Sequence, residues 1–103
     1  MNHDEIYIDN NIKLVVVYNK LHIRFLSNNY WYLACKVLLI DNLFVFLEDR
    51  ERLSSKSRRF ETAEELLNEI NKYFKYDYNI KTNITVKDIE TWQSILTVNK
   101  FLN

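Results

Sequence analysis

The sequence contains neither glycine nor proline, and the lack of glycine excludes two kinds of nucleotide site. P-loops and dinucleotide-binding fingerprints need glycine where the backbone closely approaches a phosphate, so neither motif can occur here. Turns must instead rely on asparagine, which tolerates positive φ better than most residues. The asparagine pairs at 10–11 and 28–29, together with Asn19 and Asn42, therefore mark the expected turns.

Cysteine is also scarce, because the chain holds a single thiol, Cys35. One cysteine excludes an internal disulfide and a cysteine-rich zinc site, and it fits a reducing, cytoplasmic environment. Cys35 lies among apolar residues of a predicted strand, where we expect a buried side chain rather than a nucleophile. The acidic start, Asp4-Glu5, does not fit a secretion signal. The apolar runs fall short of the ~20 residues of a membrane span, so no membrane partner is expected.

An excess of charge of one sign is missing as well. Lys plus Arg and Asp plus Glu number 14 each, which gives a formal net charge of zero. Such a balance argues against a long-range field that would draw the whole protein to nucleic acid. The 103 residues, of which 48% are hydrophobic, suffice for one domain with a core, so we predict a single domain over 1–103.

The first half of the chain shows the alternation that is typical of antiparallel strands. We expect a short edge strand at 5–8, then a hairpin formed by 12–18 and 21–26 around the turn Asn19-Lys20, with residue 18 opposite residue 21. Counting outward from that turn separates an apolar face from a mixed one. The apolar face would hold Ile12, Leu14, Val16, Tyr18, Leu21, Ile23 and Phe25, and the mixed face Lys13, Val15, Val17, His22, Arg24 and Leu26.

The segment 30–49 predicts a central hairpin that turns at Asp41-Asn42, with residue 40 opposite residue 43. Both of its faces are apolar near the turn, which a sheet with one face in water does not need. The pattern therefore predicts either a second layer supplied by the C-terminal helix or a surface for a partner. One face would hold Cys35, Val37, Leu39, Phe44 and Phe46, and the other Lys36, Leu38, Ile40, Leu43, Val45 and Leu47.

Helical patterns follow the strands. Thr62 and Glu65 form a capping box at the start of a helix expected over 63–76, and Thr85 or Asn83 can cap a second helix near 87–97. The segment 76–86 is compatible with either a strand or a loop. Strands first and helices afterwards predict an α+β fold, with a hairpin meander of four to five strands and two C-terminal helices packed on one face.

The residues that usually carry catalysis or bind metals are not grouped along the chain. His3 and His22 lack ligand-like spacing to each other or to Cys35. The acids at 48–51 alternate with arginines, and those at 61–65 lie in or beside the first turn of a helix, so local pairing and capping explain them. We therefore expect no enzyme, no cofactor and no metal site.

Two groups of residues are candidates for an interaction surface. The polar connection 48–59 carries a basic run, which a solvated loop would equally explain. The aromatic triplet at 30–32 must point to alternate faces of its strand, so at least one ring lies off the core side. The candidate residues are Arg50, Arg52, Lys56, Arg58, Arg59, Tyr30, Trp31 and Tyr32.

These features favour a small non-enzymatic binding protein that acts by protein–protein contact and sterically blocks a larger target. Phages and mobile elements carry anti-CRISPR and anti-restriction inhibitors of this size, and the abundance of Asn, Lys, Ile, Tyr and Phe suggests an AT-rich coding sequence of that origin. A homodimer is expected, because a second copy is the simplest cover for an apolar sheet face. The alternative is a nucleic-acid-binding regulator that uses the basic segment 50–59.

Overall fold

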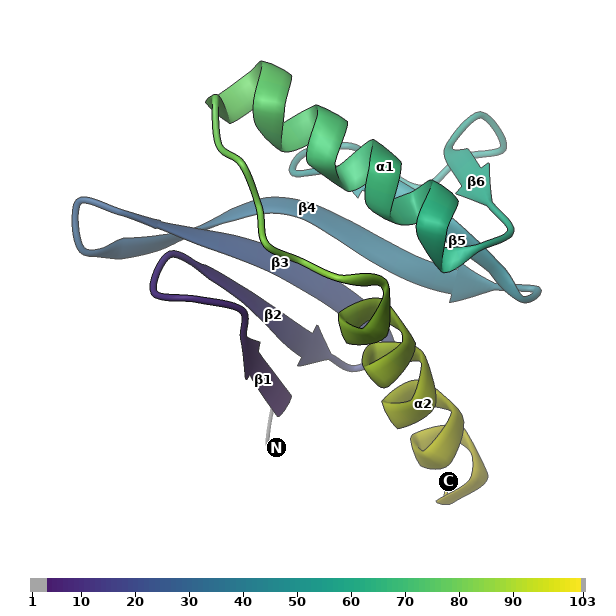
Figure 1. Ribbon diagram of the computed structural model, residues 1–103. Helices are drawn as coiled ribbons and strands as arrows, with labels where there is room; N and C mark the ends of the chain where they lie inside the picture. The colour runs from purple at the N-terminus through teal and green to yellow at the C-terminus, as the bar shows by residue number, and fades with distance from the viewer. Residues whose placement is uncertain (1–3, 103) are drawn as a thin grey trace.

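The computed structural model describes the backbone of residues 4–102 and the side chains of 5–96. Its strands form one antiparallel sheet in which each strand pairs with the next along the chain (Figure 1). The predicted α+β meander is confirmed, with six strands rather than four to five. The strands are β1 (Asp4–Tyr7), β2 (Ile12–Val17), β3 (Lys20–Ser27), β4 (Tyr30–Ile40), β5 (Leu43–Glu48) and β6 (Arg58–Phe60).

Strand β6 is the element that the sequence did not reveal. It lies in the segment expected to be only a polar connection, and it pairs with β5 through Phe44 opposite Phe60 and Phe46 opposite Arg58. Three residues that include two arginines carry too weak an alternation to predict a strand. The strand forms because the apolar Phe60 joins the core beside β5.

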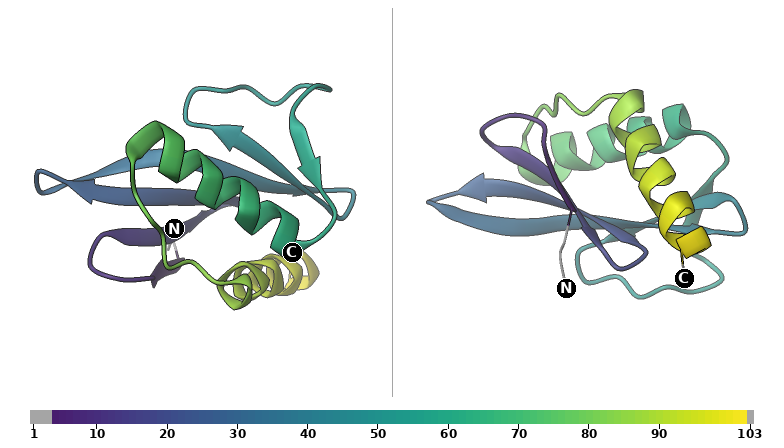
Figure 2. Two further views of the ribbon diagram at one scale, coloured as in Figure 1. Left: turned by 45° about the horizontal axis from the view of Figure 1, so that its top comes forward. Right: turned by 90° about the horizontal axis from the view of Figure 1, so that it is seen from below.

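Two helices lie on one face of the sheet, as predicted (Figure 2). They are α1 (Ala63–Tyr73), which continues into the π-helical turn η1 (Phe74–Tyr78), and α2 (Val86–Leu102). The predicted capping box is present, since the Glu65 amide donates to Thr62 Oγ1 at 3.1 Å and the Thr62 amide to Glu65 Oε1 at 3.2 Å. The boundaries differ from prediction: the α-helical part ends at Tyr73 but the π-helical turn carries the helix past 76 to Tyr78, α2 extends past 97, and 79–85 is a linker without a strand.

Asparagine occupies the tight turns, as its abundance suggested. Asn28 and Asn29 both have positive φ, as do Asp41 and Asn42, which is the pattern of a type I′ hairpin turn. The first hairpin differs from prediction, because Val17 pairs with Lys20 and the turn residues are Tyr18-Asn19. The pairing of 18 with 21 is therefore wrong.

Only Tyr18 changes its place because of that error. It sits in the turn with φ 58° and is exposed, instead of contributing to the core. The true register differs by an even number of positions, so every other residue of the hairpin keeps its predicted face. The face assignments of the central hairpin are also confirmed, with Ile40 opposite Leu43.

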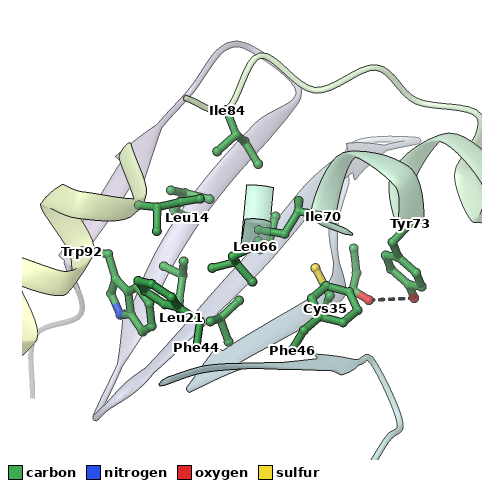
Figure 3. Packing of buried hydrophobic residues seen from close by; sticks show 14 of the residues in the cluster. Leu14, Leu21, Cys35, Phe44, Phe46, Leu66, Ile70, Tyr73, Ile84 and Trp92 are labelled. Carbon is green, nitrogen blue, oxygen red and sulfur yellow. Dashed lines mark hydrogen bonds between the residues drawn. The ribbon is translucent and has the colours of Figure 1, made fainter. Parts of the chain in front are cut away.

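The main core fills the space between the two helices and the sheet face that they cover, which we call the helix face (Figure 3). Trp92 of α2 packs near Phe44, and Leu66 and Ile70 of α1 lie over the centre of the sheet. Each large apolar side chain buried in this way contributes about 1.5–3 kcal/mol. Cys35 is fully buried here, as predicted. The core members labelled in the figure are Leu14, Leu21, Cys35, Phe44, Phe46, Leu66, Ile70, Tyr73, Ile84 and Trp92.

A β-bulge anchors α1 to the sheet. The register between β3 and β4 shifts so that Ile23 pairs with Cys35 and Arg24 with Leu33, which leaves Ala34 as the extra residue. The Ala34 carbonyl accepts a hydrogen bond of 3.0 Å from the Tyr73 hydroxyl of α1. Burial, together with a contact to the Tyr78 hydroxyl, raises the pKa of the Tyr73 phenol far above its ordinary value, so it stays a donor.

The opposite face of the sheet, which we call the outer face, is covered in part by the loop 49–57 (Figure 2, right). Leu38, Val45 and Leu47 form a small buried cluster on this side. Arg59 of β6 holds the loop in place, because its guanidinium donates to the carbonyls of Ser57 at 2.8 Å and of Ser54 and Ser55 at 3.3 Å. The loop 49–57, and not the C-terminal helix, thus covers part of the second apolar face, which corrects the expectation of a second layer supplied by that helix. The expectation of a partner on this face stays a prediction.

The turn before β2 is tied to the linker before α2 by Asp9. Its carboxylate accepts from the amides of Asn11 at 2.7 Å and Ile12 at 2.9 Å, and from the side-chain amide of Asn83 at 3.1 Å. The hydrogen bond from Asn11 is the main cause of a lowered pKa of Asp9, and those from Asn83 and Ile12 act in the same direction. The contact joins segments that are far apart in the sequence.

We expect Asp9→Ala to lower the free energy of unfolding at neutral pH by about 1–3 kcal/mol, because it leaves three donors without their acceptor. The pKa of Asp9 is lower in the folded than in the unfolded chain, so its contribution is complete above about pH 4 and declines as the pH falls further. Urea unfolding at a series of pH values measures both effects. Asp49→Ala is the control, since Asp49 makes no hydrogen bond or ion pair among the described side chains. A gap between wild type and Asp9→Ala that widens in acid would contradict this account.

Candidate interaction surfaces

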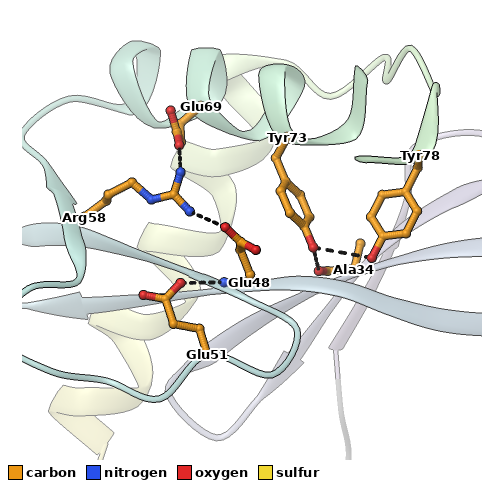
Figure 4. A network of polar contacts seen from close by, with 7 residues as sticks. All are labelled: Ala34, Glu48, Glu51, Arg58, Glu69, Tyr73 and Tyr78. Carbon is orange, nitrogen blue, oxygen red and sulfur yellow. Dashed lines mark hydrogen bonds and ion pairs between the residues drawn. The ribbon is translucent and has the colours of Figure 1, made fainter. Parts of the chain in front are cut away.

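Arg58, one of the predicted surface residues, makes contacts within the chain (Figure 4). Its guanidinium pairs with Glu48 at 2.9 Å and with Glu69 of α1, and it lies 4.8 Å from the centre of the Phe46 ring. Exposed ion pairs contribute little individually, but this arginine links β5, β6 and α1 at one point. Arg58 therefore stabilises the packing of α1 against β5 and β6.

The other four cations of the predicted basic segment fall into two groups. Arg59 is committed to the loop carbonyls, whereas Arg50, Arg52 and Lys56 are exposed on the loop. The side chains of these three make no hydrogen bond or ion pair with any described residue. The structure therefore leaves three of the five cations free to meet a ligand.

The aromatic triplet is split between the two faces of the sheet. Tyr30 and Tyr32 lie on the helix face at the end of the β3–β4 hairpin, where they are 68% and 46% exposed. Tyr32 stacks on Phe25, with 5.7 Å between ring centres. Trp31 points to the outer face. The triplet and the basic segment therefore do not form one surface.

The first part of β4 is a free sheet edge. β5 pairs with Cys35–Ile40 only, so on that side Tyr30–Ala34 has no neighbouring strand within residues 4–102. The Tyr73 hydroxyl reaches the Ala34 carbonyl, and no other main-chain group of this stretch meets α1 through a hydrogen bond. The other two edge strands, β1 and β6, are only four and three residues long.

The outer face carries a cluster that the sequence did not single out. The Lys13 ammonium lies 4.5 Å from the centre of the Trp31 ring and 5.5 Å from that of Tyr7, and it pairs with Glu5 at 3.3 Å. Tyr7 and Trp31 meet edge to face at 6.1 Å. Arg24 sits directly opposite Lys13 on the neighbouring strand. The alternation of β2 and β3 placed Lys13 and Arg24 on this face, but nothing local indicates that Tyr7 and Trp31 approach each other.

The groups considered for catalysis are kept apart. Burial, with a smaller contribution from Glu48, raises the pKa of the Cys35 thiol far above its ordinary value, so the thiol stays protonated. His22 lies on the outer face, and His3 is outside the described residues. The described side chains contain no group of three or more histidine, cysteine or acidic residues that could hold a metal ion.

A shallow hollow lies between the end of α1 and the linker that follows it. Its volume is about 490 Å³, and Thr82 donates a hydrogen bond to Asn71 at its wall. Neither a carboxylate nor a histidine lines it, and its two lysines, Lys75 and Lys81, are exposed. The lining residues are Asn71, Lys75, Asn79, Ile80, Lys81 and Thr82.

Comparison with known proteins adds nothing to these surfaces. No family model, curated protein or solved structure matches the chain. Within the described part of the chain, no helix has the length and apolar character needed to cross a membrane. The function must therefore be argued from the free edge of β4, the exposed tyrosines and the outer face.

We expect Arg59→Ala to release the loop 49–57 from the outer face, because three carbonyls lose their charged donor. The predicted loss in the free energy of unfolding is about 1–2 kcal/mol. The exposure of Val45 and Leu47 should also increase the binding of a hydrophobic dye. Urea unfolding and dye fluorescence test this, with Arg52→Ala as a control of equal charge on the same loop. Equal behaviour of the two variants would show that the loop does not depend on Arg59.

Proposed function

We propose that the chain is a non-enzymatic binding protein that acts by protein–protein contact through the free edge of β4. One observation carries the proposal. On the side where β5 pairs with the rest of β4, the stretch Tyr30–Ala34 has no neighbouring strand among residues 4–102, and Tyr30 and Tyr32 are exposed beside it. An unpaired edge offers a row of amides and carbonyls to which a strand of another polypeptide can add.

The composition of this edge supports the proposal. Soluble proteins usually protect an edge strand by making it short or by placing a lysine, a proline or a bulge in it. β1 and β6 are protected by their shortness. The stretch Tyr30–Ala34 contains no charge and no proline, and its bulge lies only at its end, at Ala34. Exposed tyrosines beside it are of the type that is enriched at protein interfaces.

A second copy of the chain is the partner that this edge fits most simply. Two neutral strands can pair antiparallel about a two-fold axis without bringing like charges together. The resulting dimer would extend the sheet across both copies. The same edge could add to a strand of a larger target and cover its surface, which is how the chain would act as an inhibitor. Carriage by a phage or mobile element stays a prediction from composition.

We expect the wild-type chain to show the mass of a dimer by light scattering at high concentration. The double variant Tyr30→Glu, Tyr32→Glu should raise the dissociation constant of the dimer at least roughly tenfold, since like charges would face each other across the two-fold axis. Tyr18→Glu is the matched control, because Tyr18 is 70% exposed at the opposite end of β3 and should not affect the mass. A monomer at every concentration would exclude the second copy. Equal effects of the two sets of substitutions would exclude the β4 edge.

A further inference from the structure

Charge is distributed unequally between the two sides of the molecule, although the whole chain is neutral. The strand positions of the outer face carry one acid and five cations, whereas α1 carries Glu64, Glu65 and Glu69 against Lys72. A neutral protein with one basic face still attracts an anionic partner to that face. The charged residues that the strand register places on the outer face are Lys13, Lys20, Arg24, Lys36, Arg59 and Glu5.

Four of these cations remain once Arg59 is assigned to the loop. Lys13 of β2 stands directly opposite Arg24 of β3. In the next row of outer-facing residues, His22 of β3 lies between Val15 of β2 and Lys36 of β4. Like charges at opposed positions destabilise a sheet unless a counter-charge lies between them. Glu5 pairs with Lys13, but no acid among the described side chains pairs with Arg24 or Lys36.

Arg24 also has an unsatisfied donor. Its Nε–H is buried and has no acceptor among the described residues. Buried donors are nearly always satisfied in native proteins, so this Nε–H beside a second cation needs an explanation. A phosphate or carboxylate that binds the terminal nitrogens of the guanidinium would supply the counter-charge.

Two aromatic side chains lie beside these cations. Trp31 belongs to β4 and Tyr7 to β1, and two strands separate them, yet their rings meet above Lys13. The Tyr7 hydroxyl donates to Glu5 at 3.2 Å, which holds its ring in place, and that ring is 60% exposed. The outer face thus combines one exposed aromatic ring, that of Tyr7, with three cations, Arg24, Lys36 and Lys20, that pair with no acid among the described side chains.

We propose that the outer face binds single-stranded nucleic acid, with Arg24, Lys36 and Lys20 on the phosphates and a base stacked on the exposed ring of Tyr7, beside Trp31. Positive charge that follows a backbone, together with rings that stack on unpaired bases, is the combination that such ligands require. A duplex keeps its bases stacked inside the double helix, where they cannot stack on a protein ring. A free phosphate has no base that could stack on such a ring. The proposal goes beyond protein–protein contact, because the site lies away from the Tyr30 and Tyr32 side chains.

The two tryptophans allow a direct optical test. Trp92 is fully buried in the core, so a change in tryptophan emission on titration with oligo(dT) of about 12 nucleotides reports Trp31. We expect quenching by oligo(dT) at low salt. The slope of log affinity against log salt should be roughly −2, as expected for three phosphate contacts to a single strand. Trp31→Phe should abolish the optical change but keep binding, as followed by the anisotropy of a labelled oligonucleotide.

Substitutions locate the site. Arg24→Gln with Lys36→Gln should weaken oligo(dT) binding at least roughly tenfold and reduce the salt slope to roughly −0.7. Tyr7→Ala should weaken it roughly tenfold through lost stacking. Arg50→Gln with Arg52→Gln removes the same charge from the exposed loop and should leave the affinity unchanged. Circular dichroism confirms that each variant is folded.

Several outcomes would overturn the proposal. Equal affinity for oligo(dT), a duplex and heparin, unaffected by Tyr7→Ala, would indicate a general polyanion patch. Binding of an acidic peptide alone would assign the face to a protein. Loss of binding in the loop variant would place the site on 50–59. The absence of binding at low salt would rule out a nucleic-acid site on this protein. The Tyr30→Glu, Tyr32→Glu variant should keep its oligonucleotide affinity, so failure here is distinguishable from failure of the dimer.

Discussion

Two helices can cover only one face of a six-stranded sheet, and this constraint explains most of what the molecule does with its remaining surface. The helix face takes α1 and α2 together with the large apolar side chains. The outer face therefore has to be covered by other elements or carry polar side chains. Near the Asp41-Asn42 turn the loop 49–57 lies over Val45 and Leu47. Beyond the reach of the loop, the face carries charged and aromatic side chains instead.

The difference in length between β4 and β5 has a second consequence. β4 has eleven residues and β5 six, so β5 cannot pair along the whole of β4. The surplus includes the aromatic triplet, which lies on the free edge. A loop or a longer β5 would protect this edge, and the described residues supply neither there. The edge and the outer face are thus two neighbouring surfaces that meet at Trp31 and arise from the same shortage of covering elements.

The arginines show why residue type alone does not reveal function. Arg58 and Arg59 looked like ligand-binding residues, yet both have partners within the chain that explain their presence. The sequence gives no signal that distinguishes Arg24, because cations are common on the polar side of a strand. Its unsatisfied Nε–H and its position opposite Lys13 make it the more informative residue. The neutral net charge is likewise compatible with a basic outer face, since a sum says nothing about how charge is distributed over a surface.

What the sequence determined by itself is local. The capping box of Thr62 and Glu65, the Asn28-Asn29 turn, and the faces of β2 to β5 all follow from backbone preference and from the strand period of two, which act between near neighbours. The tertiary structure alone decided the register of the first hairpin, the existence of β6, the cover over Val45, and the meeting of Tyr7 with Trp31. Each of these depends on contacts between segments that are distant in the chain, whose energies are set by how the whole sheet twists and packs.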